Sequence, residues 1–320
     1  MTDSREQLFR LGEDVRGQRL DQVLVAQMPG WSRTRVQELI RAGRVRVAGA
    51  AVNKPGFLLE SGGELRVELP PEQGSELPPG LEPRVLWEDQ HLVVLDKPAG
   101  LLSHSNANAS EGGAAEWAAL RYGPLPSLDE EQRAGLAHRL DRDTSGLLLV
   151  ARTLPALEAL KQAFQERRVA KTYLALVQGT TRFDSEWIEN WIGRDERTRD
   201  RIRVLPEGQG RFASTYYETR ERFRDFSFLA VFPKTGRMHQ VRVHLASIGF
   251  PLLSDPLYKP QRKHRTPLPP EAPPLARHAL HASVLELAHP VTSVPLRFES
   301  PLPADMQEVL DWLRVNRAEA

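Results

Sequence analysis

The chain has 320 residues, of which 40% are hydrophobic and 27% are charged, and its formal net charge is +1. This composition is typical of an ordinary globular protein and excludes a disordered or membrane-embedded chain. The sequence has no cysteine, which excludes disulfides, thiolate metal sites and cysteine nucleophiles. Because the net charge is small, any affinity for nucleic acid must come from local basic patches.

Residues 1–14 are expected to form an N-terminal tail. The first residues of the chain mix acidic and basic side chains and lack the apolar core of a signal peptide or transit sequence. No stretch of the sequence approaches the length and apolarity of a membrane span. We therefore expect a cytoplasmic protein without a membrane partner.

Residues 15–69 are predicted to form a small unit. Apolar residues at helical spacing around 20–28 and 36–40 predict two short helices, and the alternating residues after 44 predict a strand pair followed by a closing strand. This region is locally basic. Arg33, Arg41 and Arg44 lie over the second helix and the turn beyond it, which suggests contacts with RNA phosphates, although a solvated basic face is the ordinary alternative.

A proline-rich stretch divides the chain. Residues 70–83 are predicted to be a linker, because closely spaced prolines and glycines leave no room for a helix and little for a strand. The small unit therefore precedes a main domain over residues 84–320.

The main domain is predicted to be α+β. Residues 84–100 resemble a hairpin, since two apolar stretches surround a polar turn. Further strand-like runs are found at 146–151, 173–177, 216–218 and 226–232. Helical patterns are found at 154–166, 241–248 and 306–313. Because strands outnumber crossover helices, we expect a mixed, largely antiparallel sheet.

Residues 138–146, HRLDRDTSG, place several charges directly before an apolar run. Charges beside a buried strand are costly unless they pair or take part in chemistry. In an extended strand Asp141 and Asp143 would share a face, and paired carboxylates suggest glycosidic-bond chemistry. The structural alternative is that Asp143 caps a turn while Arg139 and Arg142 neutralise the two acids. These residues alone leave both interpretations open.

Motif spacing speaks against several other chemistries. The sequence has no Walker-type phosphate loop, no dinucleotide-binding loop and no H-E-x-x-H zinc motif. His239 and His244 are five residues apart, but they lie among arginines, which is a poor setting for a cation. We therefore predict no metal and no cofactor.

Three further stretches place polar residues within apolar elements: VVLDKPAGLLSH at 93–104, KTYLALVQG at 171–179 and the segment beginning KTGRMHQVRVHLA at 234–256. Together with HRLDRDTSG, these stretches resemble the motifs of the RluA-type pseudouridine synthase family. They also follow one another along the chain in the order that the family has. In the small unit, RLDQVLV and SRTRVQELIRAGRVRVAG resemble the S4-like RNA-binding domain of the RluD-like ribosomal large-subunit branch. The resemblance covers nearly the whole chain.

The resemblance implies roles for four residues. The aspartate of HRLD is the catalytic residue of the family, which corresponds to Asp141. The arginine two residues earlier, Arg139, is implied to fill the space that a flipped uridine leaves in the RNA. Tyr173 of the K-x-Y motif is implied to pack on the base and to be a candidate for removing the C5 proton. Arg242 of HQ-x-R is implied to pair with the catalytic carboxylate.

The chemistry of uridine isomerisation agrees with these roles. The C1′–N1 bond must break, the uracil must rotate, and C5 must join C1′, so the ribose has to be stabilised or trapped meanwhile. A single carboxylate can do this by bonding to the sugar or by promoting elimination, and the sequence leaves both open. The base must leave its stack before it can be reached. The lack of cysteine argues against the rival methylation and reduction of uracil, whose usual enzymes employ one.

Two other residues of these motifs are interpreted structurally. Lys97 lies beside a turn-forming Pro-Ala-Gly, and Asp143 is expected to serve as a turn residue or as a partner for a nearby arginine. The sequence departs from the family pattern at Met238, Ser254 and Lys259, which affect helix ends and turns rather than the expected chemistry.

The resemblance therefore implies a monomeric RNA pseudouridine synthase that isomerises specific uridines, with large-subunit (23S) ribosomal RNA or the pre-ribosomal large subunit as its partner. Transfer RNA is the alternative substrate. A non-catalytic RNA-binding ribosome-assembly factor and a hydrolase that releases free uracil are the alternatives from other classes.

Overall fold

The structure is a computed structural model. It describes residues 6–28, 33–60, 63–69, 77–105, 111–128, 134–196, 198, 200–259 and 266–319. Residues 1–5 of the predicted tail and residues 70–76 of the predicted linker lie outside the described residues. No helix in the described ranges is long and apolar enough to cross a membrane.

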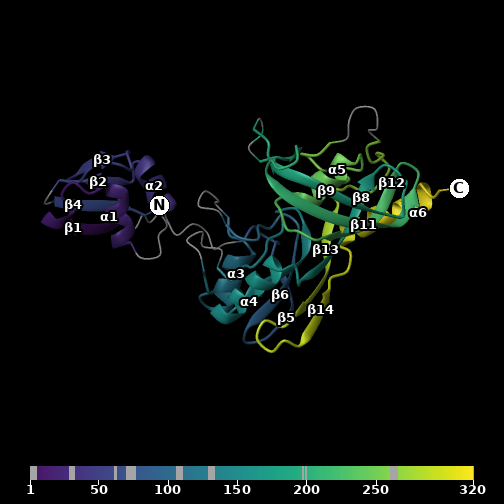
Figure 1. Ribbon diagram of the computed structural model, residues 1–320, viewed down its shortest axis with the longest axis horizontal. Helices are drawn as coiled ribbons and strands as arrows, with labels where there is room; N and C mark the ends of the chain where they lie inside the picture. Colours follow the sequence, from purple (N-terminus) through teal and green to yellow (C-terminus); the bar gives the residue numbers. More distant parts are fainter. Residues whose placement is uncertain are drawn as a thin grey trace.

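The small N-terminal unit combines one sheet with two helices (Figure 1). The strands pair antiparallel in the order β1-β4-β2-β3. The elements are β1 (Glu6–Leu11), a short 3-10 helix (Glu13–Val15), α1 (Leu20–Gln27), α2 (Arg33–Arg41), β2 (Val45–Val47), β3 (Ala50–Val52) and β4 (Gly63–Glu68). Apolar side chains of both helices and of the sheet form a shared core. The predicted helix pair and the strands that follow it are confirmed.

The N-terminal segment differs from the predicted tail. Residues 6–11 form β1, which pairs with β4 from Glu6 opposite Glu68 to Leu11 opposite Gly63. Phe9 packs on the core of the small unit and Leu11 is buried in it, so alternate residues face inward. The tail prediction is wrong for residues 6–11, because the charged neighbours of these apolar residues obscured the alternating pattern.

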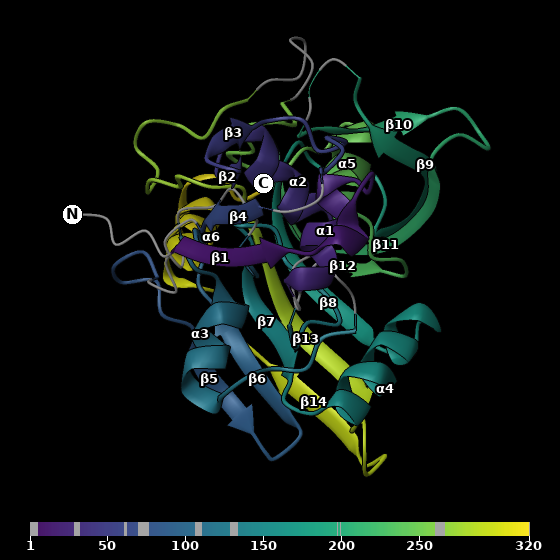
Figure 2. The same cartoon turned by 90° about the vertical axis from the view of Figure 1, so that its left-hand side faces the viewer.

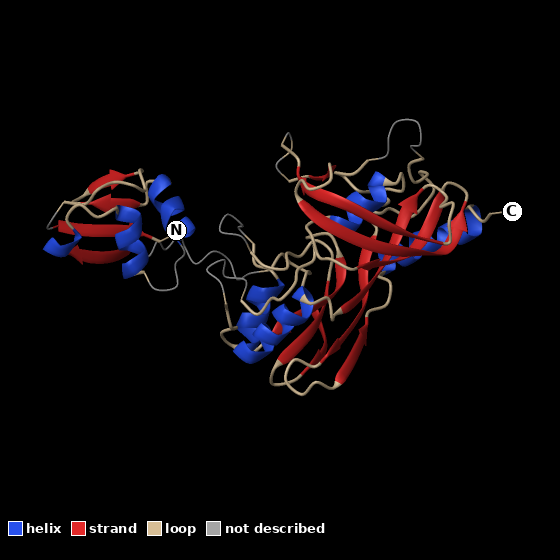
Figure 3. Ribbon diagram, in the orientation of Figure 1, coloured by secondary structure: helices blue, strands red, loops and turns tan. Residues whose placement is uncertain are grey.

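The main unit is built on a long mixed sheet with helices on its faces (Figure 3). The strand order is β10-β9-β11-β12-β8-β13-β7-β6-β5, with β14 paired to β13, and of these pairs β7 with β13 is parallel. The strands are β5 (Arg84–Glu88), β6 (Leu92–Lys97), β7 (Ser145–Ala151), β8 (Ala170–Gln178), β9 (Ser185–Arg194), β10 (Ile202–Leu205), β11 (Arg211–Phe223), β12 (Phe226–Pro233), β13 (Leu280–Ala288) and β14 (Pro295–Glu299). The helices are α3 (Ala114–Tyr122), α4 (Leu154–Gln165), α5 (Gln240–Ser247) and α6 (Ala304–Asn316). The α+β class and the largely antiparallel sheet are confirmed.

Helices cover both faces of each half of this sheet. In β7, Leu147 and Leu149 pack toward α4, whereas Leu148 and Val150 pack toward α3. Figure 2 shows these two helices with strands β6 and β7. In the other half, one face packs against α5 and the opposite face against α6. A strand covered on both sides has no polar face, which explains why β7 is a continuous apolar run.

The two halves meet at the parallel pair of β7 and β13, where Ser145 lies opposite His281 and Gly146 opposite Ala282. Gly146 has φ of 109°, a conformation that side chains rarely adopt. A Cβ atom at this position would collide with the backbone of Ala282. Glycine is therefore required where β13 passes closest to the start of β7.

Pattern reading located most elements, but not all of them. The helices predicted at 154–166, 241–248 and 306–313 correspond to α4, α5 and α6. The strand predicted at 216–218 is the middle of the much longer β11. Helix α3 and strands β9, β10, β13 and β14 were not predicted.

Candidate active site

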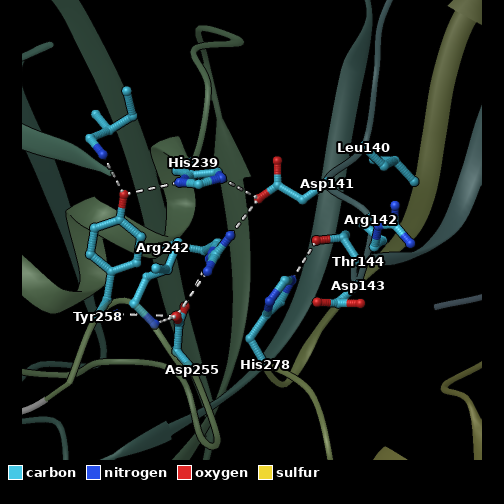
Figure 4. Close-up of polar contacts among 12 residues, drawn as sticks. Leu140, Asp141, Arg142, Asp143, Thr144, His239, Arg242, Asp255, Tyr258 and His278 are labelled. Atoms are coloured by element: carbon cyan, nitrogen blue, oxygen red, sulfur yellow. Dashed lines mark hydrogen bonds and ion pairs between the residues drawn. The ribbon is translucent and has the colours of Figure 1, made fainter. Parts of the chain in front are cut away.

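Asp141 lies in a tight turn directly before β7, and its side chain points toward Arg242 and His239 (Figure 4). The Thr144 N–H donates to the Asp141 carbonyl oxygen at 3.1 Å and closes the turn. Asp141 and Asp143 therefore do not share the face of a strand, and the paired-carboxylate arrangement considered from the sequence is wrong. The Asp141 side chain is 19% exposed, so a substrate can reach it.

Hydrogen bonds from the segment after β6 hold this turn from one side. The Ser103 hydroxyl accepts from the Leu140 N–H and donates to the Leu140 carbonyl, both at 2.9 Å. The Lys97 side chain is fully buried, and its Nζ donates to the Arg142 carbonyl oxygen at 2.9 Å. It donates also to the carbonyls of residues 98 and 101, at 3.0 and 2.7 Å. The structural interpretation of Lys97 agrees with these contacts.

Residues before β13 hold the turn from the other side. The Thr144 hydroxyl and His278 Nε2 are 2.8 Å apart. Arg277 Nη1 donates to the Asp143 carbonyl at 3.2 Å, while its other guanidinium nitrogens bind the Asp305 carboxylate. Within the described residues the Asp143 carboxylate has no hydrogen-bond partner. Asp143 therefore contacts Arg277 through its backbone carbonyl and not through its side chain. The turn is fixed on both sides, and Asp141 projects from a rigid support.

Arg242 connects Asp141 to a second carboxylate. Its Nη1 donates to Asp141 Oδ2 at 3.0 Å, and its Nε and Nη2 donate to the two oxygens of Asp255 at 2.8 and 2.9 Å. Both Arg242 and Asp255 are buried. Burial alone would lower the pKa of Arg242, but its bonds to Asp255 and the charges of both carboxylates raise it. The guanidinium is therefore a permanent cation in a fixed orientation.

Tyr173 lies on β8 and lines the same cleft as Asp141. Burial raises the pKa of its hydroxyl above the ordinary range, and the nearby negative charge of Asp141 raises it further. The hydroxyl is therefore protonated at neutral pH. The sequence prediction placed Tyr173 and Asp141 together from distant motifs, and both side chains line this cleft.

The cleft has a volume of about 1070 Å³ and is strongly basic. Arg139 is exposed and lines it. Among the described residues that line the cleft, Asp141 is the single acid. The Lys and Arg side chains there are Arg139, Lys161, Arg167, Lys171, Arg194, Arg211, Lys234, Arg237 and Arg242. This distribution suits a polyanion that presents one neutral group to the half-buried carboxylate of Asp141.

The three arginines selected in the small unit lie at α2 and just beyond it, and none of them lines the cleft. Arg33 is half exposed and donates to buried Asp21 at 3.1 Å. Arg41 is exposed and donates to Gln37 at 3.1 Å. Arg44 is half-buried. Arg41 therefore offers the most accessible charge, whereas part of the charge of Arg33 is neutralised.

Solved structures define the class of this fold. The chain is similar to "Human RNA Pseudouridylate Synthase Domain Containing 4", with a TM-score of 0.56 and 23% identity over 72% of this chain and 92% of that chain. It is similar also to "Human RNA Pseudouridylate Synthase Domain Containing 1", with a TM-score of 0.55 and 23% identity over 76% of this chain and all of that chain. The main unit therefore has the pseudouridine synthase fold.

Sequence comparisons define the family. Residues 91–247 match the RNA pseudouridylate synthase model and residues 18–65 match the S4 domain model. The chain is 38% identical to ribosomal large subunit pseudouridine synthase D of Pseudomonas aeruginosa, over 99% of this chain and 98% of that protein. It is 37% identical to the protein of that name from Xanthomonas campestris, over 96% of this chain and 92% of that protein. The chain belongs to the RNA pseudouridine synthase family, whose members are isomerases.

Sequence reasoning missed three residues of this site. They are Asp255, His239 and Tyr258. Asp255 binds Arg242, and His239 lies between Asp141 and Tyr258. All three occur within or beside the stretch at 234–256 that the sequence singled out. A buried arginine needs a carboxylate partner, and this requirement could have identified Asp255.

Proposed function

We propose that this protein isomerises specific uridines to pseudouridine in large-subunit ribosomal RNA, with Asp141 acting at ribose C1′ of a uridine that has left the RNA stack. The observation that carries the proposal is that Asp141 is, among the residues that the structure describes, the single acid lining a basic cleft, and that buried Arg242 holds it there. The choice of ribosomal RNA is supported by the names of the relatives and by the S4 domain. A ribosomal substrate also implies a cytoplasmic location.

The proposed reaction conserves all atoms of the nucleotide. The N1–C1′ bond breaks, a C5–C1′ bond forms, the proton on C5 leaves to water, and N1 gains a proton. Asp141 supports the detached ribose, either by bonding to C1′ or by promoting elimination at the sugar. Arg242 orients the Asp141 carboxylate and balances its charge without leaving its own pairing with Asp255.

The other site residues bind the substrate. Arg139 is exposed at the cleft and is available to fill the position of the extruded base. Tyr173 supplies an aromatic surface for the uracil, and its raised pKa favours this packing role over that of the base removing the C5 proton. Arg33, Arg41 and Arg44 contact phosphates through the small unit. One chain supplies every residue of this set, in agreement with a monomer.

The test is tritium release from RNA that carries uridine labelled at C5. Large-subunit ribosomal RNA and bulk transfer RNA are incubated separately with the protein, and the reaction mixture is analysed for labelled water and for free uracil. The proposal predicts labelled water from ribosomal RNA and no free uracil. Release from transfer RNA alone would overturn the substrate, free uracil would indicate a hydrolase, and no release from either RNA would indicate a binding factor.

A further inference from the structure

His239 lies between the proposed catalytic carboxylate and a buried tyrosine, and it directly precedes α5 (Figure 4). Its φ is 52°, in the left-handed region that residues other than glycine seldom occupy. Such a conformation persists only where the surroundings enforce it, and it is frequent at functional sites. The start of a helix does not by itself explain this backbone conformation of His239.

Gln240 fixes the turn that carries His239. Its side-chain oxygen accepts from the Thr235 hydroxyl at 2.7 Å and from the Arg237 N–H at 3.0 Å. Its side-chain nitrogen donates to the Ser214 carbonyl on β11 at 3.0 Å. These contacts attach the turn to the sheet and direct the imidazole of His239 into the site.

Tyr258 determines which nitrogen of His239 carries the proton. The Tyr258 hydroxyl is buried, accepts from the Ile202 N–H at 2.9 Å and lies 3.1 Å from His239 Nδ1. The backbone N–H can only donate, so the single hydroxyl proton is free to point at Nδ1. If Nδ1 carried the proton instead, the hydroxyl proton would have no acceptor among the described residues.

The contact on the opposite side of the imidazole also favours a proton on Nε2. His239 Nε2 lies 3.7 Å from Asp141 Oδ2, the oxygen that also accepts from Arg242. An Nε2 lone pair would face a carboxylate oxygen and be repelled, whereas an Nε2 proton would be attracted. The distance is slightly beyond hydrogen-bond reach, and such contacts often tighten when substrate binds.

The charges around His239 favour a neutral ring. Burial lowers its pKa, Asp141 and Asp255 act in the opposite direction, and Arg242 and Arg139 lower it further. The net shift is downward from 6.5. At neutral pH the ring therefore has one proton, which makes the choice of tautomer meaningful.

We propose that Tyr258 holds His239 in the tautomer protonated on Nε2, and that His239 is thereby a positioning residue that orients Asp141 beside Arg242. Two donors then face Oδ2, which leaves Oδ1 directed at the ribose. The proposal rests on the function proposed above for Asp141. It adds that Ile202 on β10 and Tyr258 after α5 influence the orientation of that carboxylate through His239.

Two substitutions of His239 separate this role from a backbone role. His239→Gln keeps an N–H donor near the position of Nε2, whereas His239→Asn places its amide near the position of Nδ1. Asparagine tolerates the left-handed conformation better than glutamine does. A donor role therefore predicts that the Gln variant keeps kcat within about threefold and the Asn variant loses about tenfold or more, with KM unchanged. If His239 served only to hold the backbone turn, the Asn variant would have the higher kcat and the Gln variant the lower one.

The tautomer is measured independently of activity. Spectra that correlate imidazole nitrogens with ring protons in ¹⁵N-histidine-labelled protein distinguish the two neutral tautomers, and comparison with His239→Gln identifies the His239 signals among the nine histidines. We expect Nε2 protonated in the wild type and a mixture in Tyr258→Phe, together with a reduced kcat. A wild-type ring protonated on Nδ1, or an Asn variant more active than the Gln variant, would overturn the proposal. If the wild type released no tritium, the proposed function would fail while the tautomer result stood.

Discussion

Lys97 gives the most informative prediction about how the site is supported. Its buried amine donates to three carbonyl oxygens, one of which belongs to Arg142 in the Asp141 turn. Lys97→Met keeps the length of the apolar stem and removes all three bonds. The substitution thus tests whether buried hydrogen bonds, rather than packing, hold the turn.

The loss of stability in Lys97→Met depends on how many carbonyl oxygens are left without a donor. The Arg142 carbonyl retains the Gly100 N–H at 3.0 Å, so two of the three carbonyls lose their donor. An unsatisfied buried acceptor costs about 1–3 kcal/mol. Removing a buried amine offsets part of this loss, because burying that group was itself unfavourable. We expect a net loss of about 2–3 kcal/mol and a decrease in melting temperature of about 5–10 °C.

The pH dependence has a defined sign. Burial lowers the pKa of Lys97 to about 7, whereas an unfolded lysine titrates near about 10.4. Between these values the unfolded chain binds more protons than the folded chain, so the wild-type free energy of unfolding rises with pH. The Lys97→Met variant lacks this contribution. The difference in stability between the two proteins should therefore grow from about pH 7 to pH 10.

Thermal and denaturant unfolding followed by circular dichroism measures the loss, and tritium release measures its effect on the turn. Lys259→Met is the matched control, because Lys259 is exposed. We expect the control to match the wild type and Lys97→Met to lose activity at a temperature where it is still folded. A Lys97→Met protein as stable and active as the control would refute the reasoning.

Three further predictions concern single residues. Asp143→Asn should keep most of the tritium-release activity, because within the described residues its carboxylate makes no hydrogen bond, and a loss as complete as that of Asp141→Asn would contradict this. Gly146→Ala should lower the free energy of unfolding by about 3–5 kcal/mol, because its Cβ meets the backbone of Ala282, and an unchanged melting curve would refute the close approach. The Arg19 hydrogen bond lowers the pKa of Asp21 well below its usual range, so the protection factors of the α1 amides, which compare each exchange rate with that of an unstructured chain at the same pH, should fall as pH drops below about 4, and less so in Asp21→Asn.

The fold was predictable from sequence where pattern and burial agree. The β7 segment is a continuous apolar run, and helices α4 and α6 and the two helices of the small unit have apolar residues at helical spacing. Helix α3 was not predictable, because alanines and polar residues give it a weak apolar stripe. Strand β1 was missed because its alternation is interrupted by charges and one face is exposed.

The site was predictable as a set of motifs but not as a network. The pairing of Asp141 with Arg242 came from the family resemblance, and the structure brings the two side chains to 3.0 Å across 101 positions of sequence. Asp255 and Tyr258 could not be assigned, because their roles depend on contacts that only the folded chain creates. The left-handed backbone of His239 likewise leaves no mark in the order of residues around it.

The most direct test of the account compares Asp141→Asn with the wild type in tritium release from large-subunit ribosomal RNA. The substitution preserves the size of the side chain, and Asp143→Asn in the same turn is the matched control. Melting curves and RNA-binding affinity measured in parallel show that the variants are folded and bind substrate. We expect release to fall to background in Asp141→Asn alone while RNA binding persists. Release at a rate near that of the wild type would contradict the assignment of Asp141 as the residue that acts at C1′.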